Sequence, residues 1–303
     1  MARLILAALL FVSAYSVSAE VLKPYVLAEI TTGDLRQTAE KVKAALAANG
    51  FEVIGTYQPY ANAIAICATS NELKDAAAKT ENGGFGAAQR VAVTDVGGKL
   101  QIAYVNPAYL GTAYGLGKLE AVSAKLKAAL GAKETFGSVG IDEEKLKPGV
   151  YHYAMMMPYF RDVDRLHEHA DYRTAVAAVE KNLAAGAGGT VKVYRIDLPG
   201  KEISVFGVGI PKGTIDGPEQ GEKDTDKEIM DVVDYQDLKH TAYLPYELMV
   251  VGGRVIALRA RYRIALHFPD TKMTGTHGFT KIMTAPWGIQ NALERVAGFQ
   301  RNL

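Results

Sequence analysis

The sequence predicts an α+β protein made of two copies of one domain in tandem. The first observation is a hairpin motif that returns: Val96-Gly97-Gly98-Lys99 matches Val251-Gly252-Gly253-Arg254. The second is the order of the elements expected around each hairpin, in which strands and helices do not alternate strictly. Such an order favours an antiparallel-rich sheet packed against helices over a doubly wound parallel sheet. A chain of 303 residues is long enough for two such domains.

The first half, residues 20–130, has its elements separated by cap and turn signals. Asp34 is the expected N-cap of a helix that begins at Leu35, and Asn49-Gly50 is a strong stop. The expected strands are residues 25–31, 51–57 and 62–69 and the two arms of the hairpin. Two further helices are expected at residues 72–79 and 118–130. A glycine-rich loop at 111–117 leads into the second of them.

Residues 131–149 are polar and form the expected linker, and the second half, residues 150–303, follows the same plan. Asp171 is the expected N-cap of its first helix. The expected strands are residues 150–159, 191–196 and 202–210 and the arms of the second hairpin. The expected helices are residues 172–183, 226–233 and 289–299. Two segments have no counterpart in the first half and are expected insertions: an extra segment at 161–169 and a long acidic loop at 212–227.

The first 19 residues are typical of a signal peptide. Arg3 supplies the positive start, residues 4–12 are a short apolar run, and Val17-Ser18-Ala19 fits a small-residue cleavage site. The apolar run is short for a bilayer span, so an uncleaved anchor is the less favoured alternative. We therefore expect an exported protein, periplasmic or secreted, with no stable membrane span after cleavage.

Composition excludes one class of partner and one kind of stabilisation. The formal net charge is +1, so no basic surplus is present to neutralise a phosphate backbone, and we expect no nucleic acid partner. The chain has one cysteine, Cys67, which cannot form an internal disulfide. Because Cys67 lies in the apolar run 63–68, we expect it in the core rather than as a nucleophile.

Three turn motifs of the first half resemble those of a known family. They are the helix that ends in Gly50-Phe51, the hairpin Val91–Lys99, and Asn106-Pro107 behind it. Over residues 25–130 their order resembles the DUF302 family, which has the TT1751-like fold. The second half resembles it less closely, with Phe268-Pro269 in place of Asn-Pro.

The resemblance implies two tandem TT1751-like domains, each an antiparallel sheet packed on helices. Single-copy members of the family look dimer-forming, so it also implies an intramolecular pseudo-dimer. It implies no catalytic residues, because no activity is established for the family.

Histidine and methionine residues of the second half suggest a metal site. His167 and His169 would share a face of an extended segment and could reach one ion. His152 and Met155-Met156-Met157 come shortly before them. Imidazole and thioether groups suit copper, and haem handling is a related hypothesis. The alternative is that the methionines fill the core, and the spacing matches no established metal signature.

Arg259, Arg261 and Arg263 alternate after the second hairpin. On a strand they would share one face and could hold a carboxylate, a phosphate or an acidic partner. The alternative is that the acidic segment 216–231 pairs with them inside the protein.

No Ser/His/Asp order, paired carboxylate motif or Cys/His dyad is evident, so an enzyme is the less favoured interpretation. The sequence favours an exported, soluble binding protein whose partner is another protein or a small molecule. Two alternatives stay open: copper or haem handling by the second half, and an enzyme whose site lies between the domains.

Overall fold

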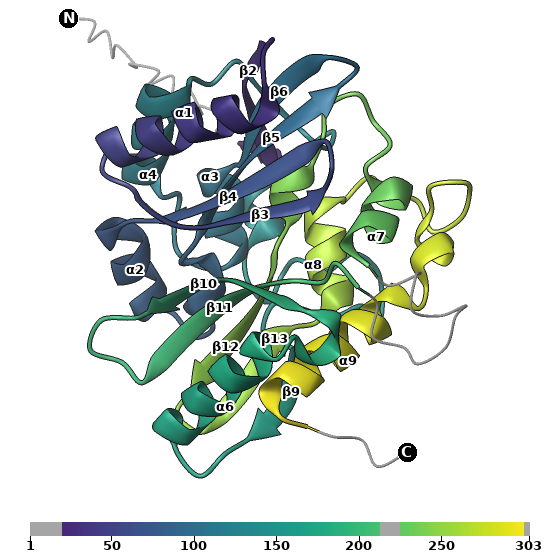
Figure 1. Cartoon of the computed structure of the whole chain (residues 1–303). Helices are drawn as coiled ribbons and strands as arrows, with labels where there is room; N and C mark the ends of the chain where they lie inside the picture. Colours follow the sequence, from purple (N-terminus) through teal and green to yellow (C-terminus); the bar gives the residue numbers. More distant parts are fainter. Residues whose placement is uncertain (1–19, 213–224, 300–303) are drawn as a thin grey trace, which may run out of the picture.

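The computed structural model describes residues 20–212 and 225–299 (Figure 1). The predicted signal peptide, residues 1–19, and residues 213–224 of the predicted acidic loop lie outside them. The described chain is mixed α+β, with antiparallel sheets packed against helices, and the predicted fold class is confirmed at this level.

The first half forms one antiparallel sheet. Its strand order is β3-β4-β5-β6-β2-β7. The strands are β2 (Tyr25–Thr31), β3 (Glu52–Tyr60), β4 (Ala63–Thr69), β5 (Gln89–Val96), β6 (Lys99–Val105) and β7 (Glu134–Phe136). The helices α1 (Leu35–Ala48) and α4 (Glu120–Leu130) cover one face. The Asp34 side chain accepts a hydrogen bond from the Gln37 N–H, which confirms the predicted cap.

The remaining elements of this region differ in part from expectation. Helix α2 (Asn71–Ala78) lies where it was predicted, and η1 (Gly83–Gly86) follows it. The predicted loop at 111–117 is wrong at its start, because α3 (Pro107–Ala113) begins at the Asn106 cap. The predicted linker carries secondary structure: β7 pairs with β2, β8 (Ile141–Asp142) pairs with β1 (Val21–Leu22), and α5 spans Glu143–Leu146.

The second half forms a sheet with the order β10-β11-β12-β13-β9, which repeats the sequential order of the first sheet without β7. The strands are β9 (Val163–Glu168), β10 (Val191–Asp197), β11 (Ile203–Gly209), β12 (Tyr246–Val251) and β13 (Arg254–Leu258). Its helices are α6 (Tyr172–Ala184), α7 (Asp226–Val233), α8 (Ala260–His267) and α9 (Ala285–Ala297), with the short turns η2 (Ala187–Gly189), η3 (Thr241–Tyr243) and η4 (Phe279–Ile282).

The first strand of the second half was predicted in the wrong place. Residues 150–159 are irregular, and the strand that pairs with β13 is β9, inside the segment taken as an insertion. The methionines do not fill the core: Met155 and Met156 are 83% and 94% exposed. Met156 also has a φ of 68°, a left-handed conformation that ends extended structure.

The two sheets meet through equivalent edges. A Cβ added to Gly55 of β3 would lie 2.2 Å from the Val193 carbonyl oxygen of β10, so the two backbones touch. Turn η1 packs on β11 and β12, while η3 packs on β4, β5 and β6. This reciprocal exchange is the pattern found between subunits related by a two-fold axis.

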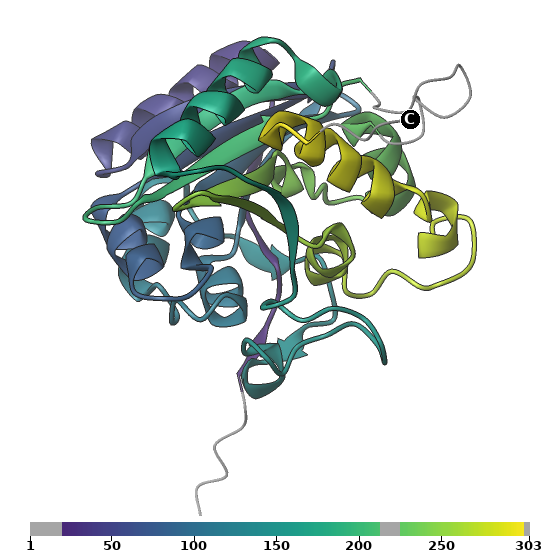
Figure 2. The same ribbon diagram turned by 90° about the horizontal axis from the view of Figure 1, so that it is seen from below.

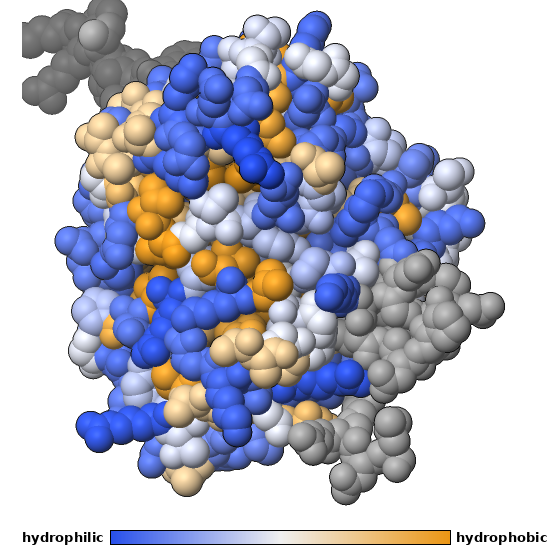
Figure 3. All heavy atoms as spheres, in the orientation of Figure 1, coloured by the Kyte–Doolittle hydropathy of each residue, from blue (hydrophilic) through white to orange (hydrophobic). Residues whose placement is uncertain are grey.

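The packing on the two sides of the sheets follows from this arrangement. Figure 2 shows α1 and α6 on one side of the sheets and α2 on the other. One core cluster draws buried residues from both halves, among them Phe85 and Met249. Hydrophobic residues also gather on the surface near the junction (Figure 3), where Ile54 and Val193 are only partly buried. The halves therefore share one core cluster, in addition to a cluster that each half builds mainly from its own residues.

Candidate functional site

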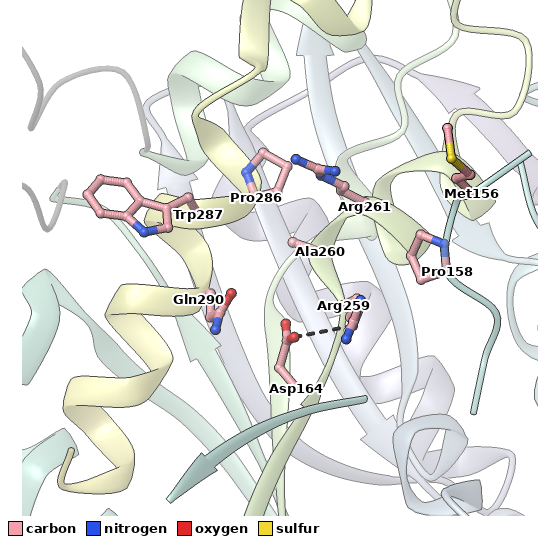
Figure 4. A pocket seen from close by; sticks show the side chains of 9 residues that line it. All are labelled: Met156, Pro158, Asp164, Arg259, Ala260, Arg261, Pro286, Trp287 and Gln290. Atoms are coloured by element: carbon pink, nitrogen blue, oxygen red, sulfur yellow. Dashed lines mark ion pairs between the residues drawn. The ribbon is translucent and has the colours of Figure 1, made fainter. Parts of the chain in front are cut away.

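An open groove of about 400 Å³ lies where the first turns of α8 and α9 approach each other (Figure 4). Three segments supply its walls: α8 with the residue before it, the start of α9, and the chain that leads into β9 together with the start of that strand. The lining residues are Met156, Pro158, Asp164, Arg259, Ala260, Arg261, Pro286, Trp287 and Gln290.

The three alternating arginines do not lie on a strand, so that prediction is wrong. Arg259 is the N-cap of α8, and the other two lie inside the helix. Residues two apart on a helix point about 200° from each other, so the three cannot share one face. Arg259 and Arg261 line the groove, whereas Arg263 points into the protein and is 2% exposed.

The groove carries more positive than negative charge. The Arg259 guanidinium lies 3.4 Å from a carboxylate oxygen of Asp164, and its side chain is 52% exposed. Burial raises the pKa of Asp164, while the charge of Arg259 acts to lower it. Arg261 is exposed and forms no ion pair with any residue in the described ranges. One guanidinium is thus weakly held, and the other is available to an anion.

The first turn of α8 lacks the cap that its counterpart has. In α3, which follows β6, the Asn106 side chain accepts a hydrogen bond from the Ala108 N–H. In α8, which follows β13, no side chain of the described residues caps the first turn. Arg259 cannot serve, because a guanidinium carries donors and no acceptor. The free N–H groups and the helix dipole therefore add to the attraction for an anion.

Exposed apolar side chains stand at the two ends of the groove (Figure 4). Trp287 is 46% exposed and Met156 is 94% exposed, and Pro158 and Pro286 lie beside them. Exposed large apolar side chains beside charged groups commonly mark a binding site. Methionine suits such a surface because its side chain adapts to different shapes.

The predicted histidine triad is only partly assembled. The rings of His167 and His169 lie 4.6 Å apart between centroids, as expected for an extended segment. His152 lies elsewhere: its Nδ1 donates to the Ala154 carbonyl, and its ring contacts Tyr159. Within residues 20–212 and 225–299, no group of three or more His, Cys, Asp or Glu side chains could hold a metal ion.

A buried ionic cluster joins the two halves, and sequence reasoning missed it. Glu247 of β12 forms ion pairs with Arg90 of β5 and with Arg263 of α8, the latter at 2.9 Å. The one signal in the sequence is a charged residue inside each of two apolar strands. All three side chains are at most 3% exposed, so the cluster serves the junction rather than a ligand from solvent.

The cluster also sets the state of His267. The Arg90 Nη2 group lies 3.1 Å from His267 Nε2 and can only donate to it. The neutral ring must therefore carry its proton on Nδ1, which lies 2.8 Å from the Tyr25 hydroxyl and donates to it. Burial, followed by the charges of Arg90 and Arg263, holds the pKa of His267 well below its usual value.

The prediction for Cys67 is confirmed. The thiol is buried in β4, and burial raises its pKa to about 12. A thiol with such a pKa is a poor nucleophile near neutral pH.

Comparison of the chain with protein-family models, with curated proteins and with solved structures finds no match. Among the helices of residues 20–212 and 225–299, none combines the length and the hydropathy that a membrane span requires. The function is therefore inferred from the groove itself.

Proposed function

We propose that this protein is an exported binding protein for small organic anions, which it holds in the groove between α8 and α9. The supporting observation is that Arg261, exposed and without an ion pair among the described residues, stands in the uncapped first turn of α8. A guanidinium can bind a carboxylate or phosphate through two parallel hydrogen bonds. The helix terminus adds backbone donors at the same place.

The apolar side chains at the two ends of the groove indicate the rest of the ligand. Trp287 offers an aromatic face, and Met156 offers a flexible thioether chain. Such groups remove apolar ligand surface from water, which contributes roughly 25 cal/mol per Å². The ligand class we propose has one acidic group and an aromatic or short aliphatic body.

We also propose that the two halves are tandem copies of a DUF302-like domain and form an intramolecular pseudo-dimer. Three observations support this: the repeated hairpin, the equal strand order of the two sheets, and the reciprocal packing of η1 and η3. Arg259 at the start of α8 occupies the position that Asn106 has at the start of α3. In this proposal the second copy acquired its anion-binding site at that position.

Intrinsic fluorescence tests the binding proposal directly, because Trp287 is the sole tryptophan of the sequence. The chain beginning at Glu20 is titrated with benzoate, decanoate and phenyl phosphate, and with benzamide as the uncharged counterpart of benzoate. We expect a saturable change in emission with at least one anion and none with benzamide.

Substitution then locates the site. Arg261→Gln removes a charged hydrogen-bond donor worth about 1.5–3 kcal/mol, so affinity should fall by at least about tenfold. Arg173→Gln, at an exposed arginine on α6, is the matched control. Absence of a saturable response to all three anions, or equal affinities for the two variants, would refute the proposal.

A further inference from the structure

A second site, independent of the anion groove, lies at the far end of β9. The His167 and His169 rings are adjacent, with their planes 80° apart. Their backbone is held by the neighbouring strand: His167 pairs with Val255, and the His169 N–H donates to the Gly253 carbonyl at 2.8 Å. The two imidazoles therefore start from fixed positions and lose little freedom when they act together.

One of the rings is oriented as metal ligands commonly are. His169 Nε2 lies 2.9 Å from the Ala297 carbonyl oxygen and must donate to it. In the neutral ring, Nδ1 then carries the lone pair. A histidine that binds a metal through one nitrogen usually donates its other N–H to a carbonyl or carboxylate, as here.

The other ring is free to bind. The His167 side chain makes no hydrogen bond to any described residue, and it lines a groove of about 250 Å³. Burial, followed by the charge of His169, lowers its pKa.

Charges around the groove decide how tight the site can be. Arg165 and Arg254 line it as well, and Glu168 is the one carboxylate among its lining residues. Glu168 pairs in register with Arg254 across β9 and β13, so its charge is partly matched. Hard cations such as Ca²⁺ and Mg²⁺ need several oxygen ligands, and the lining of this groove offers a single carboxylate. The positive charge of the two arginines weakens the binding of any divalent ion, so the imidazoles must supply the main attraction.

We infer that His167 and His169 together bind one divalent transition-metal ion, with water in the remaining coordination positions. Among first-row divalent ions, Cu²⁺ forms the strongest complexes with imidazole. Two protein ligands leave the ion open to exchange, unlike the closed four-ligand sites that hold structural metals. The site therefore suits transient holding of a metal ion.

The test uses Cu²⁺ itself and the untagged chain beginning at Glu20. Calorimetric titration in a non-coordinating buffer should give one saturable equivalent. The electron paramagnetic resonance spectrum should carry the hyperfine pattern of two imidazole nitrogens. His167→Ala is the decisive variant, because this side chain makes no hydrogen bond within the described residues and its loss should leave the fold intact; circular dichroism checks this.

His167→Ala and His169→Ala should each weaken Cu²⁺ binding by about tenfold or more, since the site has only two protein ligands. His152→Ala and Arg261→Gln are the controls and should leave binding unchanged. The inference is overturned if no saturable equivalent binds, if folded His167→Ala keeps wild-type affinity, or if His152→Ala abolishes binding.

Discussion

Replacement of Glu247 by Gln should strongly destabilise the whole chain. The carboxylate lies between two buried guanidinium groups, and the side chains of all three residues are at most 3% exposed. Removal of one partner from a buried ion pair costs about 3–5 kcal/mol, because the charge left behind is not solvated. Here one substitution leaves both Arg90 and Arg263 without their carboxylate, and the new amide turns donors toward donors. We expect a loss of at least about 4 kcal/mol.

Such a loss is large compared with the stability of a typical protein, about 5–15 kcal/mol. It corresponds to a fall of roughly 10 °C in the midpoint of thermal unfolding. The assay is urea unfolding followed by far-UV circular dichroism and by Trp287 emission. Because Arg90 and Glu247 belong to different sheets, both signals should shift together.

Two further variants make the experiment decisive. Glu180→Gln disrupts partly exposed pairs with Lys192 (2.7 Å) and Arg195 (3.4 Å), which should cost about 1 kcal/mol or less. The triple change Arg90→Met, Glu247→Leu and Arg263→Met removes all three charges and should recover part of the loss. Recovery should be incomplete, because the carbonyls of Ala242, Tyr243 and Pro245 lose their guanidinium donors. If Glu247→Gln costs no more than Glu180→Gln, the view of a dry and fully charged cluster is wrong.

The same structure leads to four other predictions. The folded-state pKa of His267 is lowered. The neutral ring therefore contributes stability at neutral pH, and this contribution is lost as the pH falls below about 6.5. Urea unfolding at pH 7.5, 6.5 and 5.5 should show the loss of stability, and His267→Gln should make that loss smaller. Burial raises the pKa of Asp226 to about 6, so this group costs the folded state stability as the pH rises, the opposite of His267. Asp226→Asn should therefore raise stability more at pH 7.5 than at pH 5. An equal effect at both pH values would contradict this. Arg259→Asn supplies the missing cap of α8 and should be more stable than Arg259→Gln by about 1 kcal/mol in thermal unfolding; equal midpoints would argue against an uncapped helix. Gly55→Ala places a methyl group 2.2 Å from the Val193 carbonyl oxygen and should cost about 2 kcal/mol in urea unfolding; a neutral result would mean that the sheets do not touch there.

Local chemistry explains what the sequence predicted well. Asp34 and Asp171 were predicted as helix caps, and each accepts a hydrogen bond from an N–H three residues later. The glycine turns of both hairpins lie where expected. These features depend on residues a few positions apart, so the sequence contains all that determines them. The apolar run around Cys67 predicted a buried strand for the same reason.

The helix at Arg259 to Arg263 shows what local pattern cannot determine. Alternating arginines fit a strand only if another strand lies alongside. Leu258 already pairs with Val163, the first residue of β9, and β12 begins after Pro245, which has no N–H to donate. With no partner on either side, β13 ends and the chain turns into α8. Strand length is therefore set by neighbours that are distant in sequence.

The sites were likewise decided by tertiary structure. Sequence proximity placed His152 with His167 and His169, but the turn at Met156 and the late start of β9 separate them. Arg90 and Glu247 meet only because two sheets pack edge to edge, and the α8–α9 groove combines side chains from three separate segments. The sequence by itself determined the class, the caps, the turns and the repeat, because those are local. The pairing of charges and the shape of the groove depend on how the halves pack, and only the folded chain decides them.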